Sequence, residues 1–477
     1  MKRTKLAIIG NGMATGKLLE ELDRRHAFAN MDVSVFGEEP HGAYNRIMLD
    51  RILKGGNVGD ILLKPEGWHQ DRGIMVYKNA QVTLVSPAAK RLWTEDGTEH
   101  LFDKLVFATG SKPRLPQMEG LKDSQGKLVP GVCAYRDVSD CQKMKDYALK
   151  GGNAVVIGGG LLGLEAAKGL SDLGMRVNLT HIFETLMNRQ LDRMGGQMLG
   201  RAMERLGIGI RTGVLTKGIV FGPKNKVIGV RLADGEILDA DLVVLAIGIQ
   251  PRATLAQESD IPVNAGILVN DQLWTGIEGV FALGECAEHR GITHGTIQPI
   301  YEQCSVLADV LTGNQADAAY LESKTYTKLK VAGVEVASMG INEPAELDDE
   351  VVQVVEEKRG IYRKLIIRDG RLAGAVLVGD TGCAPALARR FERQDLMPAN
   401  RLDALATPFR AAESGGMICH CNRVTEEVVL NQIRVGCRTL QEITAKTGAG
   451  SGCGSCRGQL ASLLLKNSTV KSATVSV

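Results

Sequence analysis

Two segments of the chain share one order of apolar and glycine-rich residues. In each, a short apolar run is followed by a glycine-rich turn, an amphipathic stretch with helical spacing and a second apolar run. This order predicts a parallel β-α-β unit, because strands covered by helices are continuously apolar. The predicted strand, turn, helix and strand of the first segment are 5–9, 10–16, 17–25 and 32–36. Those of the second segment are 154–157, 158–163, 164–173 and 176–180.

The C-terminal half shows a different pattern. Apolar and polar residues alternate over Lys328–Ser338 and again over Tyr362–Val378, which predicts half-buried strands of an antiparallel sheet. Residues 404–416 lack a clear period and contain proline, serine and glycine, as linkers do. Residues 467–477 are rich in Ser, Thr and Val, and we expect a loose tail there.

Together the patterns predict an α/β chain. It should contain two Rossmann-like dinucleotide-binding domains, a small α+β domain and a mainly helical C-terminal module. The length of 477 residues suits roughly three domains at about 150 residues each.

Composition narrows the classes of function. The formal net charge is +2, so charge favours neither nucleic acid nor a membrane surface as a partner. No apolar stretch approaches the ~20 residues that cross a bilayer. The apolar run after the basic start of the chain stops at Gly10, too early for a signal peptide, so we expect a cytoplasmic protein. The 56 glycines exceed ordinary usage, as close approach of backbone to phosphates requires.

The first glycine turn has the features of a pyrophosphate site. Gly10 allows the tight turn, and Gly12 lets a phosphate approach the N–H groups that open the helix. Thr15 stands at the third glycine position, a departure that should alter helix–strand packing more than phosphate contact. Glu38, after the second strand, is our candidate for a ribose hydroxyl, with Glu39 as a solvated neighbour. The predicted cofactor-binding residues of this turn and strand are Gly10, Gly12, Met13, Ala14 and Glu38.

The second turn matches the glycine fingerprint fully. At the end of its second strand, where an acid selects NADH or an arginine admits NADPH, the chain has His181, which leaves the choice between the two open. Glu184 could contact the ribose or could be a solvated loop acid. The predicted cofactor-binding residues here are Gly158, Gly160, Leu161, Gly163 and His181.

Half of the 10 cysteines cluster between 419 and 456. Cys419 and Cys421 form a C-x-C pair, and Cys453 and Cys456 a C-x-x-C pair, a set of four thiolates that suits [2Fe–2S] or Zn²⁺. Cys437 lies between the pairs without a partner at ligand spacing, so we expect it in the core. The remaining cysteines are isolated, and most of them are expected to be small buried apolar residues: Cys133, Cys141, Cys286, Cys304 and Cys383.

Several motifs in order resemble those of the two-dinucleotide-domain flavoprotein reductases. They are 108–110 between the two sites, 246–251 after the second and 280–285 later, so the resemblance covers roughly 4–310. It implies that Glu285 binds the ribityl chain of FAD and that Glu165 orients the nicotinamide amide; the alternative for Glu165 is an acid that complements the helix dipole. The cofactor-binding residues implied in these motifs are Ala108, Thr109, Gly110, Gly248, Gly284 and Glu285.

Residues 43–49 are similar to the stretch beside FAD in ferredoxin and rubredoxin reductases. The similarity implies that Arg46 serves the FAD phosphate or ribose and that Arg51 takes the catalytic place beside the flavin, where relatives often have lysine after serine rather than Asp50-Arg51. No cysteine precedes Cys133, so this part of the chain cannot hold the redox disulfide of disulfide reductases. Electrons should therefore leave the flavin by another route.

The sequence around the four clustered cysteines resembles the bacterioferritin-associated-ferredoxin-like (BFD-like) domain, which holds a [2Fe–2S] cluster. Glycines at 450, 452 and 454 would let backbone N–H groups approach the sulfurs, and His420 is expected to be exposed. The alternatives are a structural zinc ion and spare thiols that bind no metal. The metal ligands implied are Cys419, Cys421, Cys453 and Cys456.

Over its whole length the chain resembles the electron-input part of the NAD(P)H-dependent assimilatory nitrite reductase large subunit family and the reductase subunit of assimilatory nitrate reductase. The resemblance implies that hydride passes from NADH or NADPH to FAD and that electrons leave through [2Fe–2S] to a separate protein, expected to be a molybdenum nitrate reductase. Because the sequence ends 21 residues after Cys456, we do not expect nitrite reduction by the chain itself. The alternatives are a stand-alone ferredoxin or rubredoxin reductase, a donor to a separate nitrite reductase, and a redox sensor.

In such a reductase the chain leaves the FAD domain and returns to it. The expected parts are a discontinuous FAD-binding domain at 1–115 and 246–320, an NAD(P)H-binding domain at 116–245, an α+β interface domain at 321–403, a linker at 404–416, a BFD-like [2Fe–2S] domain at 417–466 and a tail at 467–477.

Overall fold

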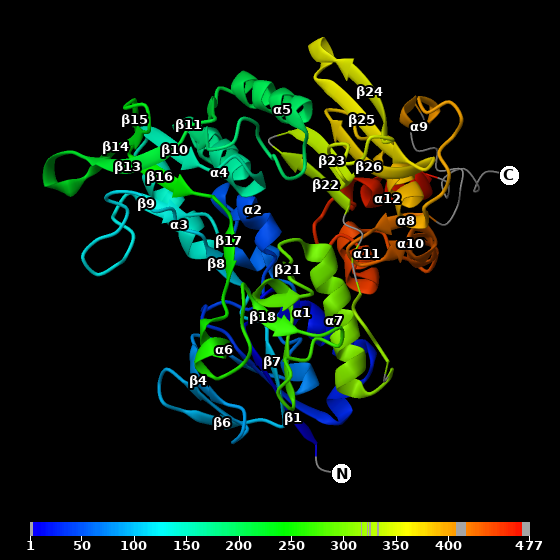
Figure 1. Cartoon of the computed structure of the whole chain (residues 1–477). Coiled ribbons are helices and arrows are strands. Elements are labelled where there is room, and N and C mark those ends of the chain that lie inside the picture. The colour runs from blue at the N-terminus through cyan, green and yellow to red at the C-terminus, as the bar shows by residue number, and fades with distance from the viewer. Residues whose placement is uncertain are drawn as a thin grey trace.

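The computed structural model describes residues 3–315, 317–321, 323, 326–331, 333–406 and 416–469. The expected linker and tail lie largely outside these residues. The first three residues of the linker belong to helix α9 (Asp403–Ala406), and the first three of the tail belong to helix α12 (Arg457–Thr469). In Figure 1 the first sheet lies at the bottom, the second β-α-β unit at the upper left, and the elements from β22 (Tyr326–Val331) to α12 at the right.

The first predicted β-α-β unit is present. It consists of β1 (Thr4–Ile9), α1 (Met13–Arg24) and β2 (Met31–Phe36), and its two strands pair in parallel. The helix begins four residues earlier than predicted, because Gly12 already serves as its N-cap and the turn is confined to 10–12.

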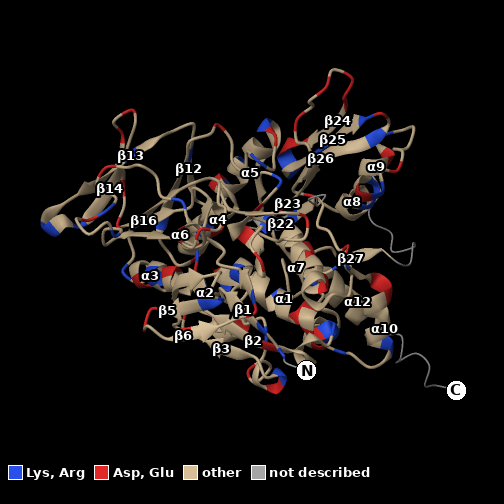
Figure 2. Ribbon diagram, turned by 60° about the horizontal axis from the view of Figure 1, so that its bottom comes forward, with Lys and Arg blue, Asp and Glu red and all other residues tan. Residues whose placement is uncertain are grey.

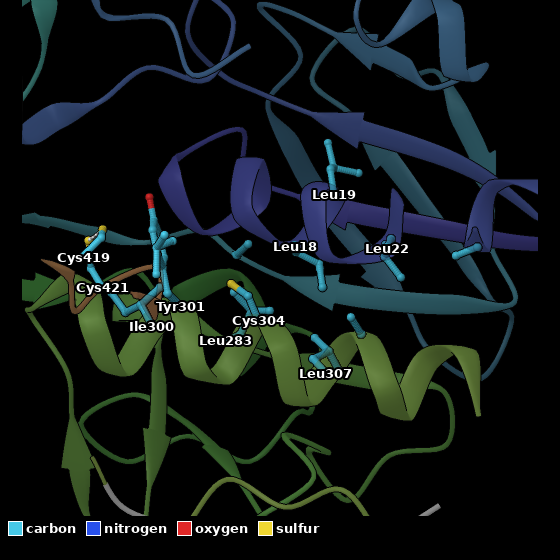
Figure 3. Packing of buried hydrophobic residues seen from close by; sticks show 14 of the residues in the cluster. Leu18, Leu19, Leu22, Leu283, Ile300, Tyr301, Cys304, Leu307, Cys419 and Cys421 are labelled. Carbon is cyan, nitrogen blue, oxygen red and sulfur yellow. Dashed lines mark hydrogen bonds between the residues drawn. The ribbon is translucent and has the colours of Figure 1, made fainter. Parts of the chain in front are cut away.

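A five-stranded parallel sheet carries this unit. Strand β19 pairs with β7 at one side, so the chain returns to this sheet after it has built the second one. Helix α1 packs against α7 (Ile297–Thr312), and the two contribute facing leucines to one core (Figure 3). The strands across the sheet are β19 (Val280–Ala282), β7 (Lys104–Phe107), β1, β2 and β3 (Met75–Tyr77).

Smaller elements surround the first sheet. The additional strands are β4 (Val82–Ser86), β5 (Arg91–Thr94), β6 (Glu99–Leu101), β18 (Ile267–Val269), β20 (Ala287–His289) and β21 (Ile292–Thr293). The additional helices are α2 (Leu49–Leu53) and α6 (Thr254–Glu258). The 3-10 helices of the chain are η1 (Ala27–Ala29), η2 (Arg46–Met48), η3 (Val58–Ile61), η4 (Gln70–Arg72), η5 (Pro223–Asn225), η6 (Gly284–Cys286) and η7 (Glu357–Arg359).

The second β-α-β unit repeats the arrangement in a sheet of its own. Two short strands, β8 (Ser111–Pro113) and β17 (Ile249–Pro251), pair antiparallel where the chain passes between the two sheets. The parallel strands of the second sheet are β12 (Gly209–Thr212), β11 (Arg176–His181), β10 (Asn153–Ile157), β16 (Leu242–Leu245) and β9 (Val132–Ala134). Its helices are α3 (Val138–Ala148), α4 (Leu161–Asp172) and α5 (Arg193–Arg205), and the adjoining antiparallel strands are β13 (Thr216–Phe221), β14 (Val227–Leu232) and β15 (Ile237–Asp239).

The predicted antiparallel sheet follows, and helix α5 of the second unit packs against it. The stretch predicted over Tyr362–Val378 is a hairpin whose turn lies at Asp369 and Gly370, both with positive φ. The strands in order across the sheet are β22 (Tyr326–Val331), β23 (Val334–Gly340), β26 (Arg371–Val378), β25 (Ile361–Arg368) and β24 (Glu350–Glu356). Helices α8 (Ala384–Arg393) and α9 complete this part.

The C-terminal module is mainly helical, as predicted. Thr425 caps its first helix, and Thr439 with Glu442 forms the predicted capping box of the second. The elements are β27 (Met417–Cys419), β28 (Val424–Thr425), α10 (Glu426–Arg434), α11 (Leu440–Thr447) and α12.

Two shared cores join these parts. One runs from the first sheet, through α1 and α7, into the four clustered cysteines, and the other joins the second unit to the antiparallel sheet. At the second junction Lys364 and Asp192 form a buried ion pair at 3.0 Å. Figure 2 shows basic and acidic residues interspersed along the ribbon. Within the described part of the chain, none of the helices combines the length and the apolar character that a membrane span requires.

Candidate functional site

The first glycine turn leaves the N-terminus of α1 open. Gly10 has φ +109°, and a Cβ there would lie 2.1 Å from the carbonyl oxygen of Ala108, so only glycine fits. A Cβ at Gly12 would meet nothing within 4 Å. No side chain caps this helix and its first turn, which begins with Met13 and Ala14, contains no acid. Its free N–H groups therefore suit a pyrophosphate.

The acidic residues that follow β2 are both paired with arginines. Glu38, the predicted ribose ligand, forms an ion pair with Arg252. Glu39 was expected to be solvated, and this expectation is wrong: it accepts a hydrogen bond from the Tyr44 hydroxyl at 2.7 Å and pairs with Arg46. Arg252 carried no sequence signal, because it lies more than 200 positions away from Glu38.

A second cluster of polar side chains lies beside Gly110. Glu285 accepts from Ser111 Oγ at 2.8 Å and pairs with Arg136, which reaches over from the β9–α3 connection. Arg46 donates to the carbonyl of Arg136 at 3.2 Å, so the predicted residues Arg46 and Glu285 belong to one network. Sequence reasoning missed Arg136.

The motif residues between and after the sites form the turns of this network. Thr109 donates to the carbonyl of Arg252 at 2.6 Å, directly after Ala108. Gly110 and Gly284 have φ of +68° and +83°, and both lie in turns at the ends of first-sheet strands.

Buried polar atoms without a partner gather around the same turn. They are Asn11 Oδ1, Arg136 Nε and Gln303 Nε2, and Gln303 also accepts from the N–H of Gly284 at 2.9 Å. Buried polar groups are normally satisfied, so these atoms fit a polar ligand such as FAD.

The second turn repeats the geometry. A Cβ at Gly158 (φ +122°) would lie 2.2 Å from the Ala246 carbonyl oxygen, and one at Gly163 would lie 1.9 Å from that of Gly158. Gly160 caps α4 just before Leu161 with open space above it, as Gly12 does for α1. Gly248 has φ +114°, also with open space around it. This turn therefore fits a second pyrophosphate.

His181 supports the second turn from beneath. Its Nδ1 accepts from the N–H of Gly159 at 3.0 Å, and its Nε2 lies 3.3 Å from Asn188 Oδ1. Burial lowers the pKa of His181. The ring is therefore neutral and carries its proton on Nε2. Glu184 is exposed and lies 3.6 Å from Arg193.

Glu165 lies one turn into α4, which packs against helix α2. Its pKa is raised to about 8, mainly by burial and secondly by the nearby carboxylate of Asp50, while Lys54 opposes the shift. Arg51, predicted beside the flavin, is exposed, and its charge lowers the pKa of Arg457 in the C-terminal module, after the larger effect of burial there. The charged groups that shift the pKa of Glu165 are Asp50 and Lys54 rather than Arg51.

The four predicted metal ligands converge. The sulfur of Cys421 lies 3.6 Å from that of Cys419 and 3.8 Å from that of Cys453. Mutual hydrogen bonds lower the pKa of Cys419 and Cys453 and raise those of Cys421 and Cys456. All four are free thiols. Cys453 and Cys456 directly precede α12, and a helix N-terminus favours the negative charge of a thiolate cluster. The donor set fits [2Fe–2S], although no three His, Cys, Asp or Glu side chains of the described chain form a ready site for a metal ion.

The other cysteines are buried, as predicted, including Cys437. The expectation that His420 is exposed is wrong. Its side chain is only 17% exposed, lies 3.3 Å from Glu392 of α8 and meets the ring of Tyr326 edge to face. These partners belong to the antiparallel sheet and its helix, which no local pattern around His420 could reveal.

Three known families match successive parts of the chain. The family described as "Pyridine nucleotide-disulphide oxidoreductase" matches residues 4–306, the "Rubredoxin NAD+ reductase C-terminal domain" matches 326–394, and the "BFD-like [2Fe-2S] binding domain" matches 417–466. The predicted fold class and the predicted cofactors, FAD, a nicotinamide dinucleotide and [2Fe–2S], are thereby confirmed.

Individual relatives of the chain support the same family assignment. The chain is 39% identical to "Nitrite reductase [NAD(P)H]" of Bacillus subtilis, over 96% of this chain and 57% of that protein. It is 34% identical to the "Assimilatory nitrate reductase electron transfer subunit" of the same organism, over 97% of this chain and 60% of that protein. The chain therefore spans less than two thirds of the length of both.

A solved structure, NADH:rubredoxin oxidoreductase from Clostridium acetobutylicum, superposes with TM-score 0.68 at 25% identity, over 85% of this chain and 99% of that one. The predicted resemblance to the electron-input part of the nitrite reductase large subunit is confirmed. With two open glycine turns, a four-cysteine module and these matches, the chain belongs to the pyridine nucleotide-disulphide oxidoreductase family and carries a BFD-like [2Fe–2S] domain.

Proposed function

We propose that this chain takes hydride from NADH or NADPH onto FAD and delivers electrons to a separate catalytic protein, an assimilatory molybdenum nitrate reductase, in the cytoplasm. The observation that carries the proposal is the core shared by the first nucleotide-binding sheet and the cysteine module. The similarity to an assimilatory nitrate reductase electron transfer subunit supports the choice of acceptor.

The bound groups supply the redox chemistry: FAD accepts a hydride as an electron pair, and a [2Fe–2S] cluster passes electrons singly. The protein supplies binding and orientation. Gly10 and Gly12 open the first phosphate site, and Gly158 and Gly160 open the second.

The acids at the site hold the polar ends of the ligands. Glu38 is proposed for the FAD ribose and Glu285 for its ribityl chain. Each now pairs with an arginine, Arg252 or Arg136, that can keep its charge compensated.

Glu165 is proposed to orient the nicotinamide amide. With a pKa near 8 it carries a proton at neutral pH, so it can donate to the amide oxygen as well as accept from the amide nitrogen. Burial in α4 just after the second glycine turn raises its pKa, and a perturbed pKa is typical of a functional group.

Two other functions have some support. The antiparallel sheet matches the rubredoxin reductase C-terminal domain, which favours a small electron carrier as acceptor. The similarity to nitrite reductases also allows delivery to a separate nitrite reductase.

The test is an anaerobic titration of the purified chain with NADH, followed by visible absorbance and low-temperature EPR. Bleaching of the flavin together with a rhombic S = 1/2 signal is expected. Flavin bleaching with no EPR signal and with bound zinc would refute electron delivery through the cysteine module. Adding purified nitrate reductase, nitrite reductase or rubredoxin to the reduced chain then identifies the acceptor by which of them reoxidises it.

A further inference from the structure

The side-chain amide of Asn45 contacts the cysteine module through its nitrogen, while its oxygen caps the 3-10 helix η2. Its side chain is 2% exposed. Nδ2 donates to the carbonyl oxygens of Ser451 at 2.8 Å and of Gly452 at 2.7 Å, while Oδ1 accepts from the N–H of Ile47 at 3.0 Å. Capping requires only the oxygen, so the two donated bonds serve the junction between segments 406 and 407 positions apart.

A second buried contact holds the cysteine loop, residues 451–453, through Asn422. Lys17 of α1 is 6% exposed and donates to Asn422 Oδ1 at 3.0 Å. Asn422 in turn donates to the carbonyl of Gly448 at 2.8 Å and to Ser451 Oγ at 3.2 Å. Because Asn422 follows the ligand Cys421 directly, Lys17 and Asn45 fix the two ligand-bearing segments from one side.

Tyr301 fills the space beneath the loop. A Cβ at Gly452 would lie 2.6 Å from the sulfur of Cys421 and 3.4 Å from Tyr301 Cε2, so the loop passes between them without room for a side chain. Lys17 lies 5.3 Å from the centre of the Tyr301 ring. Figure 3 shows Tyr301 at the end of α7 nearest Cys419 and Cys421.

The segment that carries Asn45 also touches the first glycine turn. Asn11 donates to the carbonyl of His41 at 3.4 Å, and a Cβ at Gly16 would lie 3.7 Å from Ala43 Cβ. Residues 41–45 are therefore in contact with the predicted FAD site at one end and with the cysteine loop at the other.

We propose that Asn45 is a positioning residue that fixes the cysteine loop, residues 451–453, against the first nucleotide-binding site. The proposal rests on the proposed function, because a fixed distance between the two sites matters only if electrons pass from one to the other. It adds a residue that none of the glycine, acid or cysteine motifs contains.

The test compares Asn45→Asp with Asn270→Asp in the full-length holoprotein. Aspartate at 45 keeps the oxygen that caps η2 but turns the second oxygen toward two carbonyls. Asn270 is a matched control, because its exposed side chain uses Oδ1 to accept from the N–H groups of Gln272 and Trp274, which aspartate also does.

Two measurements are made on each variant. The first is hydrogen exchange of the backbone amides over residues 450–456. The second is the rate at which NADH generates the cluster EPR signal, normalised to the signal that dithionite generates. For Asn45→Asp we expect exchange about tenfold faster and NADH-driven signal about tenfold slower, since losing two donated bonds is worth at least 1.4 kcal/mol. The dithionite signal should be unchanged, and Asn270→Asp should match the unaltered chain in both measurements.

Unchanged exchange and rate in Asn45→Asp would overturn the proposal, as would a change in one measurement without the other. If aspartate at 45 prevents FAD loading, Asn45→Ser, which keeps an oxygen for the cap, takes its place. An unaltered chain that gives no EPR signal with NADH would refute the proposed function instead, and hydrogen exchange alone would then decide whether Asn45 holds the loop.

Discussion

Replacing Glu165 with glutamine should change how the stability of the protein depends on pH. The carboxyl group has a folded-state pKa of about 8 against an ordinary value of 4.5, with burial as the main cause and Asp50 as the second. Below pH 4.5 the group is neutral in both the folded and the unfolded state. Between 4.5 and 8 the unfolded chain releases the proton while the folded chain keeps it, so the free energy of unfolding falls as pH rises. Above 8 both states are ionised and the loss stops growing.

The size of the effect follows from the two pKa values. For a group with a pKa of 4.5 in the unfolded state and about 8 in the folded state, the free energy of unfolding falls by about 3 kcal/mol between about pH 5.5 and about pH 8.5. Glutamine keeps the shape of the neutral side chain and does not ionise. Glu165→Gln should therefore gain about 3 kcal/mol relative to the unaltered chain over this interval, or on the order of 5 °C in melting temperature.

The assay is thermal unfolding of both proteins, loaded with FAD, across this pH range. Glu236→Gln is the control, because Glu236 is exposed in the turn between β14 and β15 and should show no such divergence. Asp50→Asn should reduce the divergence by removing the second cause of the shift. Parallel stability curves for Glu165→Gln and the unaltered chain would refute the reasoning, since they would show that Glu165 ionises normally when folded.

Three further changes have direct readouts. Cys453→Ser removes one sulfur ligand, so FAD content and dye reduction by NADH should persist while the cluster EPR signal and transfer to a protein acceptor are lost; unchanged transfer would contradict the ligand set. Gly163→Ala puts a Cβ 1.9 Å from a carbonyl oxygen, so we expect about 1–3 kcal/mol of destabilisation and weaker NADH binding by calorimetry; normal binding would refute the predicted packing. Lys364→Met leaves Asp192 buried without its cation and should cost about 3–5 kcal/mol in urea unfolding, whereas adding Asp192→Asn should recover part of the loss; equal stability of the two variants would contradict this.

The sequence was informative wherever function depends on local backbone geometry. Both glycine turns could be located because a strand, a tight turn and a helix follow one another within a few residues, and Gly10 and Gly158 meet the same kind of carbonyl contact. The capping box at Thr439 is local in the same way. The alternating pattern over Tyr362–Val378 identified a sheet, although the turn within it was not predicted.

Partners that are distant in sequence could not be predicted. Arg136 and Arg252 reach the first site from other elements, and nothing beside them marks that role. Glu39 and His420 were expected to be exposed, but Arg46 and Glu392 pair with them in the folded chain. The contact of Asn45 with the cysteine loop spans most of the chain and has no signature in either segment.

The return of the chain to the first sheet has a consequence for biosynthesis. Strand β19 completes that sheet beside β7, yet all strands of the second sheet are made between them. At roughly 5–20 residues per second, a ribosome needs on the order of 10 to 35 s to pass from Phe107 to Val280. During that time the first sheet has an open edge at β7, whereas the second sheet has every strand it needs once Leu245 has been made. The second sheet can therefore form on the ribosome before the first is complete, and the exposed edge at β7 is the site where a chaperone would be most useful.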